Sequence, residues 1–240
     1  MRNNRPIRAI LFDKDGTLFD YEKSWGAVNR AAARLAARGD EALAATLLAI
    51  GGVDPASGRT RPGSPLAAGS TREIAEAWVE ANSPYEVSAL TTDLDGLFTR
   101  SAVHAVPVTD LDALMGRLTA RGLVLGIASS DSEGAVRTTL RAFGLEHHVR
   151  CAIGYDSGFG AKPGPGMVHG FAAATGIAPA EMAVVGDNLH DMEMARAGGA
   201  GLRIGVLTGT GSRADLATLA DICLPSIADL EQALDARAAG

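Results

Sequence analysis

The sequence contains very little lysine and no basic tract, and both shortages bear on which ligands the chain can bind. Lysine occurs only at positions 14, 23 and 162, so arginine supplies every other basic side chain. The 28 acidic residues outnumber the 22 lysines and arginines, which argues against a nucleic-acid partner. With a net charge of −6, the chain would have to hold any anionic ligand by local positive groups.

Cysteine and long apolar runs are scarce too. The only cysteines, Cys151 and Cys223, lie in apolar stretches, where we expect buried free thiols of the kind that fit a reducing compartment. Neither the first residues, MRNNRPIRAILFD, nor any later segment has the apolar length of a signal peptide or a membrane span. These shortages predict a cytoplasmic protein that makes no membrane contact.

Six short apolar segments end in polar or glycine-rich turns. They are IRAILFD (7–13), LVLGIASS (123–130), VRCAIG (149–154), MAVVGD (182–187), LRIGVL (202–207) and DICLP (221–225). Helix-like stretches follow at 132–143, 165–175 and 188–197. Strands that alternate with helices of this length predict a parallel, doubly wound α/β sheet. Because the apolar runs are continuous, we expect both faces of the sheet to be covered.

This alternation is interrupted once, between the first strand and the next one near Leu123. The intervening segment is alanine-rich and helical in pattern, with a glycine- and proline-rich loop at 54–70. Its simplest explanation is a small helical domain inserted after the first strand. We therefore predict an α/β core domain of residues 1–17 and 105–240, and a helical insertion of residues 18–104.

Polar side chains follow the predicted strands where each strand ends. These are Asp13 and Asp15 after the first, Ser129 and Ser130 after the second, Lys162 after the third, and Asp187 after the fourth. The carboxyl ends of parallel strands meet at one edge of a sheet, so these side chains should lie together. Aspartates so close repel each other, and a hard cation such as Mg²⁺ would hold them. Its ligands would be Asp13, Asp187 and the backbone carbonyl of Asp15.

Such a site suits a phosphate ester. Asp13 would attack phosphorus and form an aspartyl phosphate. Asp15 would protonate the leaving alcohol and later activate water. The Ser129 hydroxyl and the Lys162 charge would bind the phosphate oxygens.

At these residues the chain resembles the haloacid dehalogenase superfamily, and within it the phosphoglycolate phosphatase-like hydrolases. LFDKDGTLFD matches the first motif of that family, and the strand ending in Ser129 matches the second. Lys162 before a proline matches the third motif, and VVGDNLHDMEMARAGGAG, with Asp187 and Asp191, matches the fourth. The resemblance implies the roles given above, with Asp191 supporting the metal or Lys162. It also implies a Rossmann-like core and a mobile cap, formed by the insertion, that selects the substrate.

The resemblance implies a Mg²⁺-dependent phosphatase of a small phosphorylated metabolite, with phosphoglycolate as the leading substrate. Sugar phosphates and nucleotides stay open, as do a phosphomutase and a catalytically silent phosphate-binding protein. Asp15 argues against dehalogenation, and a phosphonate-cleaving relative would need an insertion lysine, for which only Lys23 is available. Both a monomer and a homodimer fit the sequence.

Several flanking residues have two interpretations. Ser130 begins SDSE, the spacing of a helix capping box, so it is either a cap or a second phosphate donor. Asn188 is either a helix cap or a neighbour of the metal site. Arg59 and Arg61, in the loop of the insertion, either hold a second anionic group of the substrate or serve solubility.

Two further motifs resemble functional sites, but we interpret both as structural. TTDLDGLF, at 91–98, repeats Asp-x-Asp-Gly without a preceding strand, and we interpret it as a turn inside the insertion. RIGVLTGTGSRADL resembles a dinucleotide fingerprint, but no βαβ unit follows it. We predict a tight turn into a helix there.

Overall fold

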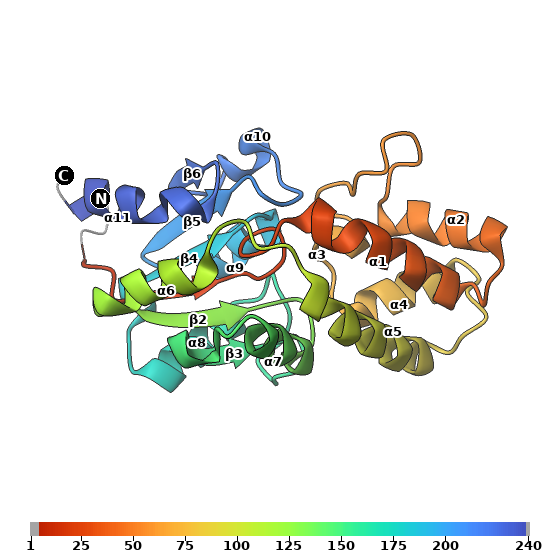
Figure 1. Cartoon of the computed structure of the whole chain (residues 1–240), viewed down its shortest axis with the longest axis horizontal. Coiled ribbons are helices and arrows are strands. Elements are labelled where there is room, and N and C mark those ends of the chain that lie inside the picture. Colours follow the sequence, from red (N-terminus) through yellow and green to blue (C-terminus); the bar gives the residue numbers. More distant parts are fainter. Residues whose placement is uncertain (1–4, 239–240) are drawn as a thin grey trace.

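The computed structural model describes residues 5–238. The first four and last two residues of the predicted core domain, 1–4 and 239–240, lie outside the described residues. The structure contains a six-stranded parallel sheet in the order β3-β2-β1-β4-β5-β6 (Figure 1). The strands are β1 Ala9–Phe12, β2 Val124–Ala128, β3 Val149–Ile153, β4 Met182–Gly186, β5 Leu202–Val206 and β6 Ile222–Leu224. Each lies in one of the six apolar segments, which confirms the predicted α/β fold.

Strand β1 lies inside the sheet and shows why its sequence is apolar throughout. Ile10 and Phe12 belong to one apolar cluster, shared with α6 (Leu111–Ala120), α7 (Glu133–Ala142) and α11 (Leu230–Ala238). Ala9 and Leu11 point to the other face, where α8 (Gly166–Thr175) and α9 (Leu189–Ala197) complete a second cluster. All four side chains are fully buried, as expected for a strand covered on both faces.

The insertion between β1 and β2 is helical and has an apolar core of its own. Its helices are α1 Tyr21–Ala36, α2 Glu41–Gly51, α3 Pro65–Ala68, α4 Thr71–Glu80 and α5 Val87–Ser101. They pack around Leu47, Trp78, Leu90 and Leu94, which are fully buried. Leu18 and Phe19 pack in the sheet's cluster instead, so the insertion's own packing begins at Tyr21.

Two local predictions were wrong. TTDLDGLF is no turn, because it lies inside α5, where Leu90, Leu94 and Phe98 bury one face at helical spacing. The helix after β2 lies within the predicted stretch 132–143, but its N-cap is Ser132 rather than Ser130, because the Ser132 hydroxyl accepts a hydrogen bond from the backbone N–H of Ala135 at 3.3 Å. The turn after β5 leads into a short helix, α10 (Arg213–Leu216), as predicted.

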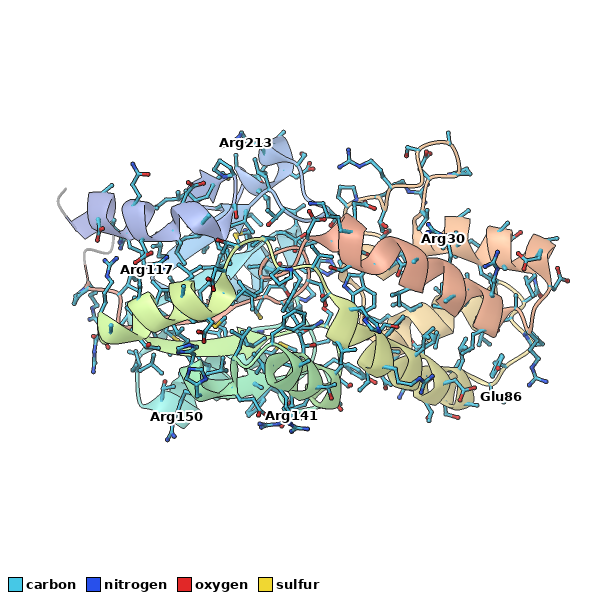
Figure 2. The ribbon with its side chains drawn as sticks, viewed as in Figure 1. Arg30, Glu86, Arg117, Arg141, Arg150 and Arg213 are labelled. Atoms are coloured by element: carbon cyan, nitrogen blue, oxygen red, sulfur yellow. The ribbon has the colours of Figure 1, made fainter. Side chains whose placement is uncertain are left out.

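Charged side chains cover the outside of both parts. Figure 2 labels several of them, all exposed: Arg30, Glu86, Arg117, Arg141, Arg150 and Arg213. Both cysteines are free thiols and only partly buried, rather than fully buried as expected. None of the helices within residues 5–238 combines the length and the apolar character that crossing a membrane requires.

Candidate active site

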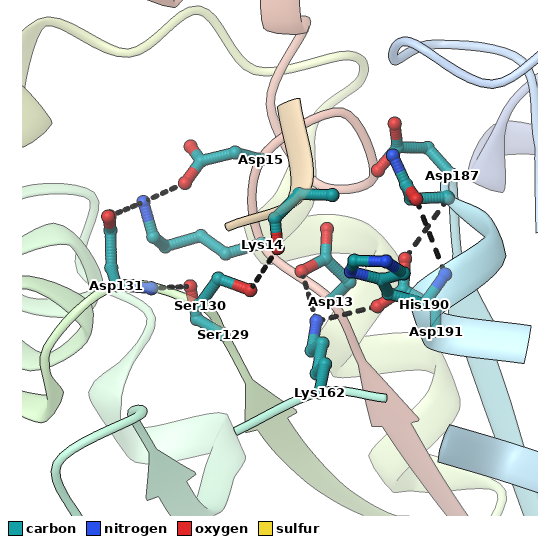
Figure 3. A network of polar contacts seen from close by, with 12 residues as sticks. Asp13, Lys14, Asp15, Ser129, Ser130, Asp131, Lys162, Asp187, His190 and Asp191 are labelled. Carbon is teal, nitrogen blue, oxygen red and sulfur yellow. Dashed lines mark hydrogen bonds and ion pairs between the residues drawn. The ribbon is translucent and has the colours of Figure 1, made fainter. Parts of the chain in front are cut away.

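The structure brings the polar residues that follow the strands together at the carboxyl edge of the sheet (Figure 3). Asp13 is fixed beside β4, because its backbone N–H donates to the Val185 carbonyl at 2.8 Å. Lys162 Nζ lies 2.6 Å from Asp13 Oδ1 and 2.6 Å from Asp191 Oδ1. All three side chains are buried, so this lysine bridges two carboxylates that water hardly reaches.

Three of the carboxylates fit a metal site. Asp13, Asp187 and Asp191 each offer an oxygen within 4.8 Å of the others. Asp13 Oδ2 is buried and has no hydrogen-bond partner among the described residues. This unpartnered oxygen and the two neighbouring carboxylates together form a set of oxygen ligands that a hard divalent cation prefers. Asp191 thus joins the two aspartates predicted as ligands.

Burial, together with repulsion from neighbouring carboxylates, makes the ionisation of Asp13 and Asp187 unfavourable. Burial raises the pKa of Asp13 to about 7, against the attraction of Lys162 and with added repulsion from Asp191. Burial also raises the pKa of Asp187 well above its usual range, and the neighbouring Asp13 adds to this. A divalent cation would reverse both effects by favouring the charged forms.

The backbone at two glycines packs so closely against the Asp187 side chain that no larger residue would fit at either position. Gly16 has φ +86°, and a Cβ atom there would lie 2.5 Å from Asp187 Cγ. A Cβ at Gly209 would overlap the same carboxylate. Thr210 then donates its backbone N–H to Asp187 Oδ2 at 2.8 Å. The loop after β5, which we interpreted only as a turn, therefore holds a site residue, and sequence analysis missed this.

Asn188 and Asp191 form a capping box at the start of α9. The Asn188 side chain accepts from the N–H of His190 at 3.3 Å, and Asp191 Oδ2 accepts from the N–H of Asn188 at 3.1 Å. Asp191 Oδ1 contacts Lys162. Asn188 is thus a helix cap, and Asp191 both caps the helix and orients the site lysine.

The two serines after β2 have different surroundings. Ser129 Oγ accepts a hydrogen bond from the N–H of Asp131 at 3.1 Å. The hydroxyl proton of Ser129 has no acceptor among residues 5–238. Ser130 Oγ donates to the Ala68 carbonyl of the insertion at 3.1 Å. Ser130 is therefore neither a helix cap nor placed to give its proton to phosphate; it connects the core to the insertion.

A charge cluster around a buried lysine, which the sequence analysis missed, lies beside these serines. Lys14 Nζ is 2.5 Å from Asp15 Oδ2 and 2.9 Å from Asp131 Oδ2. Lys14 is 2% exposed. Burial alone would lower its pKa, but the Asp131 and Asp15 carboxylates raise it. Its ammonium also lies 5.4 Å from the ring centroid of Trp25 in α1, within the range of a cation–π contact.

A cavity of about 60 Å³ lies between the charged edge of the sheet and the insertion. On the insertion side its wall includes Tyr21, Trp25, Asn29, Thr71, Ile74 and Phe98. Arg59 and Arg61 are absent from this wall and exposed, and Arg61 donates to the Ala49 carbonyl at 3.2 Å. Lys23 also lies outside it and pairs with Asp20 at 2.7 Å. The structure therefore does not bring these three basic residues to the site.

Known proteins with similar sequences include several phosphatases. A phosphoglycolate phosphatase from Rhodospirillum rubrum is 32% identical over 107 residues, which span 45% of this chain and 44% of that protein. One from Shigella boydii is 29% identical over 98% of this chain and 95% of its own length. An N-acetylmuramic acid 6-phosphate phosphatase from Pseudomonas aeruginosa is 25% identical over 80% of this chain and 79% of its own.

The fold also has solved counterparts. The crystal structure of a hydrolase from Pseudomonas syringae superimposes with a TM-score of 0.71 at 22% identity, covering 96% of this chain and 99% of that one. The family model of haloacid dehalogenase-like hydrolases matches residues 7–199, which include the first strand, the insertion and every aspartate of the site. The chain is a member of the haloacid dehalogenase-like hydrolases.

Proposed function

We propose that the protein is a phosphatase that hydrolyses a small phosphomonoester with Mg²⁺ as its cofactor. The observation that carries this proposal is the buried cluster of Asp13, Asp187 and Asp191 around Lys162, in which Asp13 Oδ2 has no partner among the described residues. When bound, the cation would offset the charge of these carboxylates and of an incoming phosphate.

Asp13 is the nucleophile of the proposed reaction. One of its carboxylate oxygens attacks phosphorus while the bond from phosphorus to the leaving oxygen breaks, which gives an aspartyl phosphate. Asp15 donates a proton to the leaving alkoxide. It then takes a proton from the water that attacks the aspartyl phosphate, so that inorganic phosphate and free Asp13 are released.

The other residues of the site hold the phosphate. The Ser129 hydroxyl can donate to a phosphate oxygen, because its hydrogen bond from Asp131 uses only its oxygen. Lys162 supplies a fixed positive charge beside the nucleophile. Such groups stabilise the charge that develops on the transferred phosphoryl group.

The names of the relatives favour phosphoglycolate, yet they also include a phosphatase of a larger sugar derivative. Sugar phosphates, nucleotides and a phosphomutase activity thus remain alternatives for the substrate and the acceptor. A silent phosphate-binding protein is disfavoured, because Asp13, Asp15, Ser129 and Lys162 are all present around the cavity.

Phosphate release, measured with and without Mg²⁺ from p-nitrophenyl phosphate and small phosphomonoesters, tests this proposal. We expect metal-dependent release that Asp13→Asn abolishes. Asp93→Asn is the matched control, because Asp93 begins the other Asp-x-Asp-Gly and is exposed on α5. Binding of inorganic phosphate without any turnover by the folded protein would instead identify a silent binder.

A further inference from the structure

The insertion's side of the cavity is electrically neutral. Within residues 5–238, neither arginine nor lysine contributes to this wall, which consists of aromatic, aliphatic and neutral polar residues and includes residues 66–69. Tyr21 stays uncharged as well, because burial raises the pKa of its hydroxyl, which donates to the Leu66 carbonyl at 2.6 Å. A leaving group that faces the insertion therefore meets no positive charge there.

The core side of the same cavity has an excess of negative charge. Its carboxylates are those of Asp13, Asp15, Asp131, Asp187 and Asp191. The two ammonium groups among them, on Lys14 and Lys162, already contact two carboxylates each. One divalent cation would not neutralise this cluster once a phosphate dianion joined it. A second anionic group on the substrate would find no free arginine or lysine in this cavity, and only the His190 ring, whose buried Nδ1 has no hydrogen-bond partner among the described residues, could face it. Burying such a group without an ammonium or guanidinium partner is unfavourable.

Unpartnered polar atoms indicate what the leaving group would offer instead. The indole N–H of Trp25, which is 8% exposed, is buried without a hydrogen-bond partner among the described residues. Asn29 is 2% exposed, and its Nδ2 reaches the Tyr21 hydroxyl only at 3.4 Å. A buried donor without an acceptor costs about 1–3 kcal/mol. An acceptor oxygen on the leaving group would satisfy such a donor, and a hydroxyl oxygen does so without adding the negative charge of a carboxylate.

The size of the cavity limits the length of the leaving group. Its 60 Å³ gives room for roughly four to six water-sized groups. A phosphate group would occupy most of this space, so the cavity favours a short leaving group.

We propose that the substrate is the phosphomonoester of a short, neutral polyol, an inference that rests on the phosphatase function proposed above. The phosphate lies against the charged edge of the sheet, and a hydroxyl oxygen of the polyol accepts from the Trp25 indole. This substrate differs from phosphoglycolate, whose leaving group carries a carboxylate, although the sequence resemblance and the names of relatives favour phosphoglycolate.

Two matched pairs of substrates test the inference with the unmodified protein and Mg²⁺. 2-Hydroxyethyl phosphate and 2-phosphoglycolate differ only by CH₂OH in place of carboxylate, and so do glycerol 3-phosphate and 3-phosphoglycerate. We expect kcat/KM to be about tenfold higher or more for the neutral member of each pair. p-Nitrophenyl phosphate reports separately whether the phosphatase chemistry works.

A charge placed on the neutral wall provides a second test. Ala67 lines the cavity from α3 and is only half-buried, so Ala67→Lys should fold, and Ala67→Gln is its neutral control. We expect Ala67→Lys, and not Ala67→Gln, to raise kcat/KM for phosphoglycolate relative to 2-hydroxyethyl phosphate. Arg59→Ala and Arg61→Ala should leave the ratio for both pairs unchanged.

The possible results separate the two proposals. Equal or higher kcat/KM for the carboxylate member of both pairs would overturn the polyol assignment and leave the phosphatase function intact. A selective loss of phosphoglycolate turnover in Arg59→Ala, Arg61→Ala or His190→Gln would do the same, by identifying a partner for the carboxylate. A folded, Mg²⁺-loaded protein that hydrolyses none of these compounds, p-nitrophenyl phosphate included, would reject the phosphatase function and the polyol assignment with it.

Discussion

The core and the insertion face each other across one cavity, yet they contribute opposite kinds of side chain. The core presents aspartates and lysines at the ends of hydrogen-bonded strands, in ion pairs of 2.5 to 2.9 Å. The insertion presents neutral and aromatic residues from four helices that pack around a separate apolar core. Under the proposed function, this contrast would separate two tasks: the sheet edge would carry the reaction, and the helices would determine which leaving group fits.

Among the variants that test this contrast, Asp15→Asn should produce the largest effect, a loss of kcat. Loss of the general acid should lower kcat for an alkyl phosphate by about 10²–10⁴-fold. The loss for p-nitrophenyl phosphate should be smaller, because its leaving group needs less protonation. Steady-state kinetics on both substrates, with the unfolding midpoint as a check on folding, measure the difference. An equal loss on both would show that Asp15 is not the acid.

Lys14→Met tests the side chain that links the two parts. It would leave the mostly buried carboxylates of Asp15 and Asp131, 16% and 13% exposed, without their shared cation, which should cost about 3–5 kcal/mol of unfolding free energy. Urea denaturation measures this cost. The double variant Lys14→Met, Asp131→Asn is the control and should recover a substantial part of it. No recovery would show that the charge of Asp131 is not what makes the single variant unstable.

The charged edge should also make stability depend on pH. Asp13 has a pKa of about 7 in the folded protein, against 3.8 for the ordinary group, so the folded state holds its proton when the unfolded state has lost it. Without metal, unfolding free energy should therefore fall as pH rises between about 4 and 7, by on the order of a few kcal/mol.

Mg²⁺ should reverse this trend, since it binds the ionised carboxylates. The shift of the thermal midpoint that Mg²⁺ produces should therefore grow as pH rises through about 7. Thermal unfolding at several pH values, with and without the metal, measures both effects. A Mg²⁺ shift that is largest at acidic pH would contradict the assignment of the metal to these carboxylates.

The smallest effect is expected where the two parts touch. Ser130→Ala removes the hydrogen bond to the Ala68 carbonyl, which should cost about 0.5–1.5 kcal/mol of stability. KM for p-nitrophenyl phosphate should stay unchanged, because the hydroxyl faces the insertion. A raised KM would assign Ser130 to phosphate binding after all. Ser132→Ala, which removes the helix cap, is a control of similar size, about 1 kcal/mol.

The sheet and its edge were predictable because their signals are local. Each strand is an apolar run with a polar residue directly behind it, and parallel pairing then brings Asp13, Ser129 and Asp187 to one edge. The capping box of Asn188 and Asp191 is also a local pattern. Such features depend on neighbours in the chain, so they need no knowledge of how distant helices pack.

What the sequence did not reveal depends on contacts between distant segments. Lys14 meets Asp131 only because β1 and β2 are neighbours, and its position between two aspartates looks unremarkable by itself. Thr210 reaches Asp187 only through close packing at Gly16 and Gly209. The positions of Arg59 and Arg61 follow from how their loop folds back on α2, which no short motif encodes.

The scarcity of lysine has a practical consequence for handling the protein. The side chains of Lys14 and Lys162 are 2% and 3% exposed, whereas that of Lys23 is 68% exposed. Reagents that acylate lysine side chains should thus find a single target, on the first turn of α1 and outside the cavity. A fluorophore or a surface linker coupled to Lys23 would mark the insertion at one defined point and leave both site lysines unmodified.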